Sequence, residues 1–569
     1  MPKDITNAFL ALNDKSIPMY VRKIEVNDTS DELNYKETYT VYLEDANRQR
    51  HTIKVDLPKI LENRYLFIGG NKKRIKFQNL LYPVVKTKEN IVQINTNYNK
   101  MFIERVENKS TSENERLFKM ITSSDELLKM FPKGNAIAAN NANITTVEYD
   151  ELSKRFAEFN NGKMKLIFDQ NEAKEFAESK NIKTPKNNMF IGIDKQEKPI
   201  FIDIDTQKTK DGKTIVMTIL DSLPEEYRKQ YESIKAPARL MYVRAKVMKQ
   251  FISVGLLLGF WEGLTSVLTK GKVKYRLENK LPALTPTEGF IQFADCFLIY
   301  EETVANSLIL NGFKFMDTSK IPINDMDTKD AYLPYIVKRY GTAIISNALL
   351  NTYEFYIDPI TKEVLEDLNL PTDIVSLILY AVSLLSDSQY VSEIYQGLAR
   401  IRSTEIIPAI LYEQLAKRYT SYRQSNGKKK FSVPQDRVIK EIMALKTVED
   451  LSTLNPTLEM EMCHGISSKG FRGANVDEAY TIEKRMYDAS MTGIIAPSSS
   501  PDGSVGVNKT LSMEPSIKSL RGYVELKDNK LDELHDVNLY SPGELSIPMG
   551  ASYDDPTRLG HALHIGGRI

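Results

Sequence analysis

The length of the chain excludes a fold built around one hydrophobic core. A single core stops growing at roughly 250–300 residues, and this chain has 569. Hydrophobic residues make up 42% of the sequence and charged residues 27%, which is the balance of a folded globular protein rather than of a disordered or fibrous one. The sequence therefore predicts a protein of roughly three or four domains.

The charge of the whole chain gives no sign of nucleic-acid binding. Lys and Arg together number 76 and Asp and Glu 75, so the net charge of +1 creates no overall basic field. Any contact with DNA or RNA would therefore come from local clusters of basic residues.

Cysteine and histidine usage excludes a disulfide framework and indicates no structural metal. The two cysteines, Cys296 and Cys463, lie far apart, which is typical of a reducing compartment such as the cytosol. No spacing of Cys and His matches a zinc site, so we assign no metal to this chain. The longest apolar runs, 251–261 and 374–385, are too short to span a bilayer, and they predict core helices and no membrane partner.

Local patterns predict a mixture of strands and helices. Residues 39–43 and 52–55 alternate apolar and polar side chains around a turn, and Gly69-Gly70-Asn71 separates two further strand-like runs, so two β-hairpins are expected. From about residue 123 helical and strand patterns mix, and Ile374 begins a helical apolar face after Asp373, a suitable helix cap. The sequence therefore predicts a multidomain α+β fold.

The composition changes after about residue 451, where Gly, Ser and Pro become frequent. Segments 465–473 and 497–504 read as a linker by composition alone. Apolar and charged residues nevertheless persist at 480–486 and 494–495, which favours ordered loops fixed to a scaffold.

Short motifs in this part of the chain resemble the β subunit of multisubunit DNA-directed RNA polymerases. The motifs that carry the resemblance are Asn-Pro-Thr-Leu-Glu at 455–459 followed by Ile466, Ser467 and Gly470, the Pro-rich run at 497–503, Asp-Asp-Pro-Thr-Arg at 554–558, and the weaker matches at 67–71 and 397–403. They follow the order of the family over about 39–558. The chain thus resembles the N-terminal half of a split β subunit, of the kind found in giant bacteriophages.

The resemblance implies an RNA polymerase β-subunit-like architecture of protrusion, lobe and fork. The expected domains are 1–140 for the first part of the protrusion, 141–395 for the lobe, 396–448 for the second part of the protrusion, 449–525 for the fork and fork loop, and 526–569 for the start of a catalytic-core barrel that another chain completes.

The resemblance also implies a function and a set of partners. The chain would form one wall of the DNA/RNA cleft of a DNA-dependent RNA polymerase and would be inactive alone. Its partners would be the C-terminal half of β, a β′ subunit that holds the catalytic Mg²⁺, template DNA, the RNA transcript and nucleoside triphosphates, with room for a promoter-specificity factor. The expected setting is the cytoplasm of an infected bacterial host, with a place in the virion left open.

Arg558 is the residue predicted to contact the triphosphate of the incoming nucleotide, as its counterpart does in the family. A guanidinium presents a planar fork of donors to phosphate oxygens, which suits that role. The competing interpretation is a turn in which Arg558 pairs with Asp554 or Asp555.

The fork loop supplies the other candidate residues. Lys469, Arg472, Lys484 and Arg485 are predicted to contact template or hybrid phosphates, although ordinary solvated surface charge would explain them equally. Gly470 and Gly473 are predicted to let the loop backbone bend close to nucleic acid, or simply to form a turn.

Two other functions remain open from the sequence. Paired aspartates at 203 and 205, or at 325 and 327, would bind Mg²⁺ in a self-sufficient metal enzyme. Alternatively, the chain is a noncatalytic polymerase-like scaffold or virion interaction protein.

Overall fold

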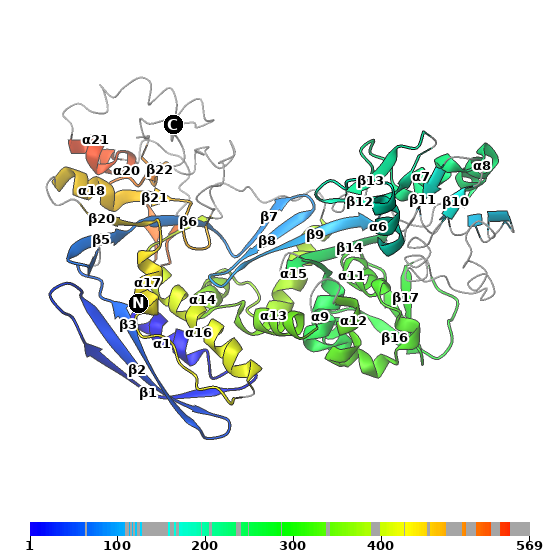
Figure 1. The fold of residues 1–569 in the computed structure, drawn as a ribbon. Coiled ribbons are helices and arrows are strands. Elements are labelled where there is room, and N and C mark those ends of the chain that lie inside the picture. Colours follow the sequence, from blue (N-terminus) through cyan, green and yellow to red (C-terminus); the bar gives the residue numbers. More distant parts are fainter. Residues whose placement is uncertain are drawn as a thin grey trace. The chain divides into compact units, whose positions relative to one another are not determined.

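The computed structural model divides the chain into two compact units. Unit 1 comprises residues 1–103, 246–250 and 339–569, and unit 2 comprises residues 104–245 and 251–338. Figure 1 shows the elements of both. The structure describes residues 1–62, 65–108, 113, 116–117, 120–121, 124, 126–127, 157–159, 164–166, 170–194, 196–203, 208–234, 240–247, 250–285, 287–336, 342–387, 399–425, 427–451, 456–473, 492–496, 508–519, 521–524 and 535–546.

Unit 1 begins with helix α1 (Pro2–Leu10) and an antiparallel sheet of β1 (Met19–Asp28), β2 (Lys36–Asp45) and β3 (Arg50–Pro58), in that order. Val41 pairs with Ile53 and Tyr39 with Val55, which confirms the hairpin predicted from their alternation. One face of this sheet is buried in the same core as α1 and the long helix α16 (Ile406–Gln424).

A second, three-stranded sheet has the order β20-β5-β4. Strands β4 (Leu66–Ile68) and β5 (Asn71–Ile75) form the other predicted hairpin, turning at Gly69 and Gly70 with positive φ. Strand β20 (Val448–Asp450) brings acidic side chains to the basic strand, so that Lys73 pairs with Asp450 and the Lys76 ammonium lies 2.5 Å from the Glu449 carboxylate. Part of the positive charge of residues 72–76 is therefore paired within the protein.

The third sheet of unit 1 joins segments from across the chain. Its order is β22-β21-β6-β19-β24-β23, and β21 pairs parallel to β6. The apolar residues of this sheet form a small core that includes Ile401, Ile466 and Leu511. Its strands are β6 (Phe77–Leu81), β19 (Ala399–Arg402), β21 (Gly465–Ser467), β22 (Asn508–Thr510), β23 (Ile517–Lys518) and β24 (Tyr523–Val524).

Helices cover these sheets, and one of them was predicted closely. Helix α15 (Ile374–Ser386) begins after Asp373, whose carboxylate accepts a hydrogen bond from Ser376 N at 3.0 Å, so the predicted cap and core helix are confirmed. The remaining elements of unit 1 include β7 (Val84–Lys88), β8 (Ile91–Asn95), α13 (Thr342–Phe355), α14 (Pro359–Asp367), α17 (Arg437–Met443), α18 (Pro456–His464), α20 (Asp536–Leu539) and α21 (Pro542–Ser546). The boundaries between the units fall within or beside β9 (Lys100–Asn108), β14 (Leu240–Val247) and β15 (Gln250–Ser253).

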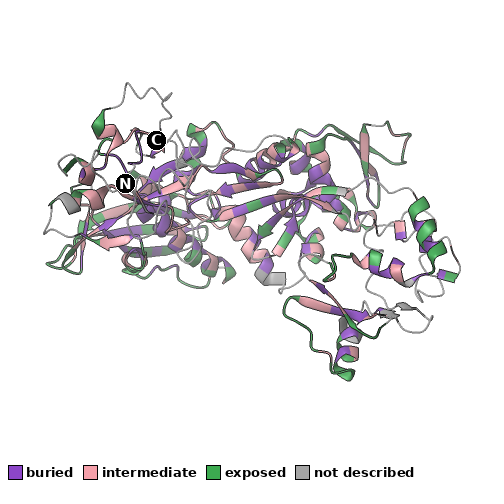
Figure 2. Cartoon of the chain, turned by 90° about the horizontal axis from the view of Figure 1, so that it is seen from above, coloured by how far each residue is buried: buried purple, intermediate pink, exposed green. Residues whose placement is uncertain are grey.

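Unit 2 contains two antiparallel sheets, of order β10-β11-β12-β13 and β16-β18-β17. Helix α9 (Val254–Glu262) is buried over almost its whole length, as the apolar run predicts, and Figure 2 shows the distribution of buried residues. The other strands are β10 (Ala157–Phe159), β11 (Met164–Leu166), β12 (Asn188–Ile193), β13 (Pro199–Asp203), β16 (Tyr275–Glu278), β17 (Glu288–Gln292) and β18 (Phe297–Glu301). The other helices include α6 (Gln170–Ser179), α7 (Ile215–Ser222), α8 (Glu225–Ser233), α10 (Leu264–Lys270), α11 (Val304–Leu310) and α12 (Leu333–Ile336), with short 3-10 turns at Asn311–Phe315, Thr318–Lys320, Ile323–Asp327 and Lys329–Ala331.

A search of the described helices finds none with the length and apolar character needed to cross a membrane.

A buried carboxylate makes the stability of unit 1 depend on pH. Asp56 accepts hydrogen bonds from Lys36 Nζ at 2.9 Å, Thr38 Oγ1 at 2.7 Å and Gln435 Nε2 at 2.8 Å. Burial alone would raise the pKa of Asp56, but these hydrogen bonds outweigh it and hold the pKa below its ordinary value. A carboxylate whose pKa is lowered by folding contributes stability above its unfolded pKa, and that contribution is lost as the pH falls through the folded pKa.

We therefore expect the thermal unfolding midpoint to fall as the pH is lowered below about 4, the ordinary pKa of an aspartate, and to fall less steeply for Asp56→Asn. Circular dichroism at a series of pH values measures both curves. Asp211→Asn, a change at an exposed turn, controls for the lost charge. Identical pH dependence for Asp56→Asn and wild type would show that Asp56 does not carry the effect.

Candidate nucleic-acid interface

The loop of residues 467–473, which starts in β21, is bent and packed tightly against the sheet. Gly470 has a φ of +115°, and a Cβ there would lie 2.7 Å from Thr447 Cγ2. At Gly473 a Cβ would lie 2.4 Å from Gln78 Nε2. The backbone bends at both glycines, as predicted. Glycine is required at these two positions because the loop packs closely against Thr447 and Gln78 of the protein itself.

Three side chains from other elements donate hydrogen bonds to alternate carbonyls of the 467–473 loop. Gln78 Nε2 donates to the carbonyl of Lys469 at 3.1 Å, and Lys100 Nζ donates to the carbonyl of Gly473 at 3.1 Å. Between them, Arg402 Nη2 donates to the carbonyl of Phe471. The loop is thus fixed along its length by donors from β6, β9 and β19.

Arg402 is the centre of this arrangement. Its side chain is fully buried, and its Nε donates to Gln78 Oε1 at 2.9 Å while Nη1 donates to Asn97 Oδ1. The guanidinium also lies 5.6 Å from the centre of the Phe471 ring. Burial lowers the pKa of Arg402 to about 10, with the Glu405 carboxylate acting in the opposite direction. The side chain therefore stays charged at neutral pH.

Asn97 links Arg402 to the end of a helix. Its backbone N donates to Asp358 Oδ2 at 3.0 Å and its Nδ2 donates to Asp358 Oδ1 at 3.1 Å. The same Asp358 is the N-cap of α14. The carbonyl of Asn97 accepts a hydrogen bond from Arg472 Nε at 3.3 Å. This bond adds to the three that the carbonyls of the loop accept from Gln78, Lys100 and Arg402.

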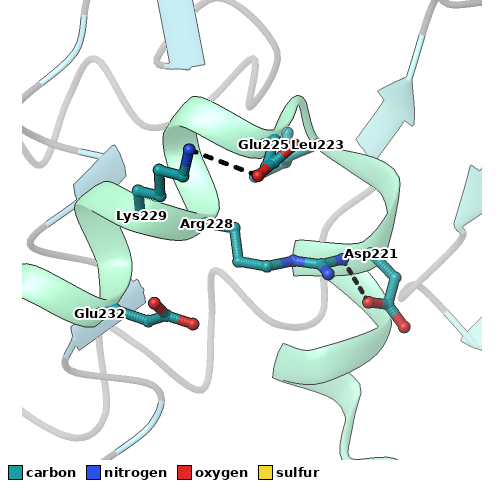
Figure 3. A pocket seen from close by; sticks show the side chains of 6 residues that line it. All are labelled: Asp221, Leu223, Glu225, Arg228, Lys229 and Glu232. Carbon is teal, nitrogen blue, oxygen red and sulfur yellow. Dashed lines mark hydrogen bonds and ion pairs between the residues drawn. The ribbon is translucent and has the colours of Figure 1, made fainter.

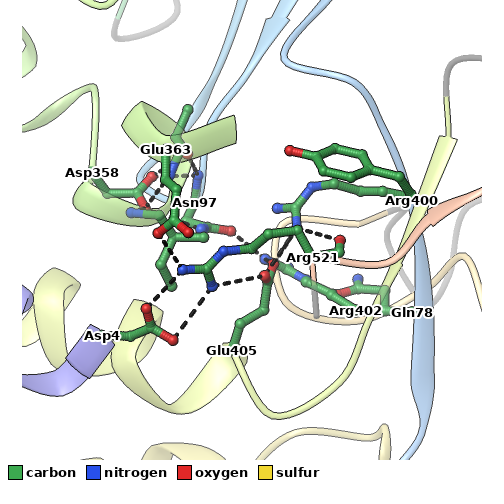
Figure 4. Close-up of polar contacts among 12 residues, drawn as sticks. Asp4, Gln78, Asn97, Asp358, Glu363, Arg400, Arg402, Glu405 and Arg521 are labelled. Carbon is green, nitrogen blue, oxygen red and sulfur yellow. Dashed lines mark hydrogen bonds and ion pairs between the residues drawn. The ribbon is translucent and has the colours of Figure 1, made fainter. Parts of the chain in front are cut away.

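A second group of charges, some buried and some partly buried, lies beside the first, as Figure 4 shows. Arg400 Nη1 is 2.8 Å from Glu405 Oε1, and Arg521 Nη2 is 2.7 Å from Asp4 and 2.6 Å from Glu363. Burial would raise the pKa of Glu405, but the charges of Arg400 and Arg402 outweigh burial and lower it. This group ties α1, α14 and α16 to the six-stranded sheet that carries the loop.

The structure places two of the predicted phosphate-contacting residues on this loop. Arg472 has a φ of +58° and its guanidinium lies 3.1 Å from the Glu413 carboxylate, with 28% of the side chain exposed. Lys469 is partly exposed, and its backbone N donates to Ser467 Oγ at 3.0 Å. Lys484, Arg485 and Arg558 lie outside the described residues. None of these contacts with nucleic acid is tested by the geometry, so they remain predictions.

The residues that hold the loop were missed from the sequence. Arg402, Gln78, Asn97 and Lys100 are separated by up to 324 residues. Only Arg402 lies in a motif named from the sequence, the weaker match at 397–403, and no role was predicted for it there. The available signal was the alternation Arg400-Ile401-Arg402, which places two arginines on one face of a short strand and a core isoleucine on the other.

The described residues provide no site for magnesium. Among them no group of three or more His, Cys, Asp or Glu side chains is placed to hold a metal ion. Asp327 instead accepts hydrogen bonds from Thr265 N at 2.9 Å and Thr265 Oγ1 at 2.7 Å, which is a structural role at the start of α10. Asp205 lies outside the described residues. We therefore derive no step of a reaction through a metal bound to these residues.

A shallow hollow of about 360 Å³ lies between α7 and α8 in unit 2 (Figure 3). Both cations that line it are paired within the protein, since Arg228 lies 2.5 Å from Asp221 and Lys229 lies 3.4 Å from Glu225, and Glu232 adds a further negative charge. Such exposed, internally paired charges offer little to an anionic ligand.

Comparison with known proteins places the chain among the RNA polymerases. The bacteriophage RNA polymerase family matches residues 1–477, which is most of the chain. The protein belongs to the bacteriophage RNA polymerase family. A search of curated proteins found no match.

This finding corrects the identification made from the sequence. The prediction of half of a split β subunit is wrong, because the matched family is one of single-subunit bacteriophage RNA polymerases. The predicted role as one wall of a multisubunit cleft is wrong for the same reason, and the C-terminal half of β and the β′ subunit are not supported as partners. The predicted RNA polymerase class and phage origin are confirmed.

The architecture inferred from that resemblance remains a prediction. Protrusion, lobe and fork, with boundaries at 1–140, 141–395, 396–448, 449–525 and 526–569, came from the β-subunit motifs and from no independent observation. Those motifs are short and rich in Gly and Pro, which recur wherever a chain must turn. Gly470 and Gly473 illustrate this, because their packing against Thr447 and Gln78 accounts for them without any polymerase fork.

Proposed function

We propose that this protein is a DNA-directed RNA polymerase that adds nucleotides to RNA on a DNA template and works in a phage-infected bacterial cell. The observation that carries the proposal is the family match over residues 1–477. Template DNA, the RNA product and nucleoside triphosphates are then its ligands. Mg²⁺ is proposed as the cofactor, because nucleotidyl transfer moves a phosphoryl centre of high negative charge and metal ions neutralise that charge.

We further propose that the 467–473 loop binds the phosphate backbone of the template or the product. Lys469 and Arg472 lie on a loop whose backbone is fixed, and Lys100 lies beside Gly473 at its end. Cations held in this way position a nucleic-acid strand without reading its sequence. Arg472 pairs with Glu413 at 3.1 Å, and Glu413 also lies 2.8 Å from Lys417, so this carboxylate keeps a cation beside it when a phosphate takes its place on Arg472.

Arg558 keeps its proposed role as a contact of the incoming triphosphate. The support for this role is chemical, because a guanidinium binds the oxygens of a triphosphate through two parallel hydrogen bonds. The carboxylates of Asp554 and Asp555 can accept the same two bonds and are the competing partners. Lys484 and Arg485 remain proposed contacts of the nucleic-acid strand.

The purified chain alone is expected to extend an RNA primer annealed to a DNA template when supplied with the four nucleoside triphosphates and Mg²⁺. Gel analysis of a labelled primer measures extension, and reactions without template or Mg²⁺ serve as blanks. Arg558→Ala is expected to raise the KM for nucleotides, while Lys54→Ala, at an exposed position in β3, is expected to leave it unchanged.

Failure of the wild-type chain to extend any primed template would overturn the proposal and favour a noncatalytic scaffold or virion role. Extension that is equal in wild type and Arg558→Ala would keep the polymerase and remove the role of Arg558.

A further inference from the structure

We propose that Arg402 is a positioning residue of the nucleic-acid interface, which sets the shape of the 467–473 loop so that Lys469 meets a phosphate. This inference rests on the proposed function. The Arg402 side chain is fully buried, so its effect on a bound strand passes through the loop.

The contacts form two routes from Arg402 to the loop. In the direct route, Arg402 Nη2 donates to the carbonyl of Phe471. In the indirect route, Arg402 Nε donates to Gln78 Oε1 at 2.9 Å, and Gln78 Nε2 donates to the carbonyl of Lys469 at 3.1 Å. The hydrogen bond from Arg402 fixes the orientation of the Gln78 side-chain amide. The amide then holds the carbonyl of Lys469 in place, and with it the backbone of the loop at that residue.

The chemistry of these contacts explains why an arginine stands at position 402. Its three hydrogen-bond acceptors, on Gln78, Asn97 and Phe471, are all neutral and approach three different nitrogens of one planar group. A lysine has a single nitrogen and cannot reach three acceptors in different directions. Burying a charge is costly unless it is well hydrogen-bonded, so a side chain needed only to fill space here would be apolar. The guanidinium therefore serves to connect the three acceptors.

Arg400 provides an internal control for this idea. It lies two residues away on the same strand, is similarly buried, and pairs with the same Glu405. Among the described residues, however, its hydrogen bonds are with Glu405 and with the carbonyl of Arg521 at 3.4 Å, and not with the loop. A change at Arg400 thus disturbs the buried charges without releasing Phe471 or Gln78.

A double-mutant cycle on nucleic-acid affinity tests the proposal. The variants are Lys469→Gln, Arg402→Lys and their combination, and the dissociation constant for an RNA primer annealed to a DNA template is measured at several salt concentrations. Lys469→Gln alone is expected to weaken binding roughly threefold at low salt and to reduce the slope of log affinity against log salt by about one, as for the loss of one phosphate contact. In the Arg402→Lys background the same substitution is expected to change binding less than about 1.5-fold.

The control cycle combines Lys469→Gln with Arg400→Lys, where the roughly threefold effect of Lys469→Gln is expected to persist. Thermal unfolding checks that each variant is folded. If Arg402→Lys does not fold, Gln78→Met takes its place, since it breaks the indirect route to Lys469, and the same loss of effect is expected.

The outcomes separate this inference from the proposed function. If Lys469→Gln has no effect on affinity in the wild-type background, the phosphate contact of the proposed function is wrong and the positioning role falls with it. If Lys469→Gln has its full effect in the Arg402→Lys background, the interface stands and Arg402 is only structural. Equal coupling with Arg400→Lys would show a general loosening of the sheet and would also overturn the inference.

Discussion

Asp358→Ala is expected to lower the free energy of unfolding of unit 1 by about 3–5 kcal/mol. Asp358 is 1% exposed and caps α14 by accepting from the backbone N of Ile360 at 3.1 Å and of Thr361 at 3.0 Å. It also accepts from the backbone N and the Nδ2 of Asn97. Alanine removes the cap and leaves buried donors of Asn97 without this acceptor, and each unsatisfied buried group costs about 1–3 kcal/mol.

The matched control is Asp373→Ala at the cap of α15. Asp373 accepts from Ser376 N at 3.0 Å but is exposed, so its loss is expected to cost only about 1 kcal/mol. Amide hydrogen exchange in peptides of α14 and α16 measures the stability of unit 1. Trp261 is the single tryptophan and lies in unit 2, so its fluorescence follows the other unit separately. Equal losses for the two variants would show that the contacts with Asn97 contribute little.

Elements encoded by local patterns could be predicted from the sequence, whereas the large sheet of unit 1 could not. The hairpins at β2–β3 and β4–β5 are set by alternation and by turn residues a few positions apart, and α15 by a cap and an apolar stripe. In the six-stranded sheet β21 has three residues and β24 two, too few to show any periodicity. Each also pairs with a strand more than one hundred residues away, β21 with β6 and β24 with β19, and no local rule makes those pairings.

The shape of the candidate site could be predicted only at its glycines, whose backbone can adopt conformations that other residues rarely adopt. Glycines at 470 and 473 indicate a bend whatever packs against it, and the bend is there. The sequence gives no such sign for Arg402, because an arginine normally indicates solvent-exposed surface and this one is fully buried. Its burial depends on acceptors from β6, from the turn at Asn97 and from the loop itself, which only the tertiary fold brings together.

Gly522→Ala is expected to destabilise unit 1 by about 3–5 kcal/mol, through a steric clash with the strand that carries Arg400 and Arg402. Gly522 has a φ of +74°, and a Cβ there would lie 1.8 Å from the carbonyl oxygen of Ile401 and 2.6 Å from its carbon. Both are backbone atoms of β19, so no side chain can rotate away. The strand itself must move, and the hydrogen bond from Ile401 N to the carbonyl of Gly522 at 2.8 Å is strained or lost.

Gly69→Ala separates this clash from the conformational cost of the substitution. Gly69 has a φ of +66° and no atom within 4 Å of its added Cβ, so it should show only the cost of a left-handed alanine, about 1–2 kcal/mol. Hydrogen exchange of unit 1 measures both variants. Because β19 is displaced in Gly522→Ala, Arg402 is displaced with it, and the variant should also weaken binding to primed template where Gly69→Ala does not. Equal destabilisation of the two variants would show that β19 yields to the clash at no cost, and the sheet would then be too compliant to fix the 467–473 loop.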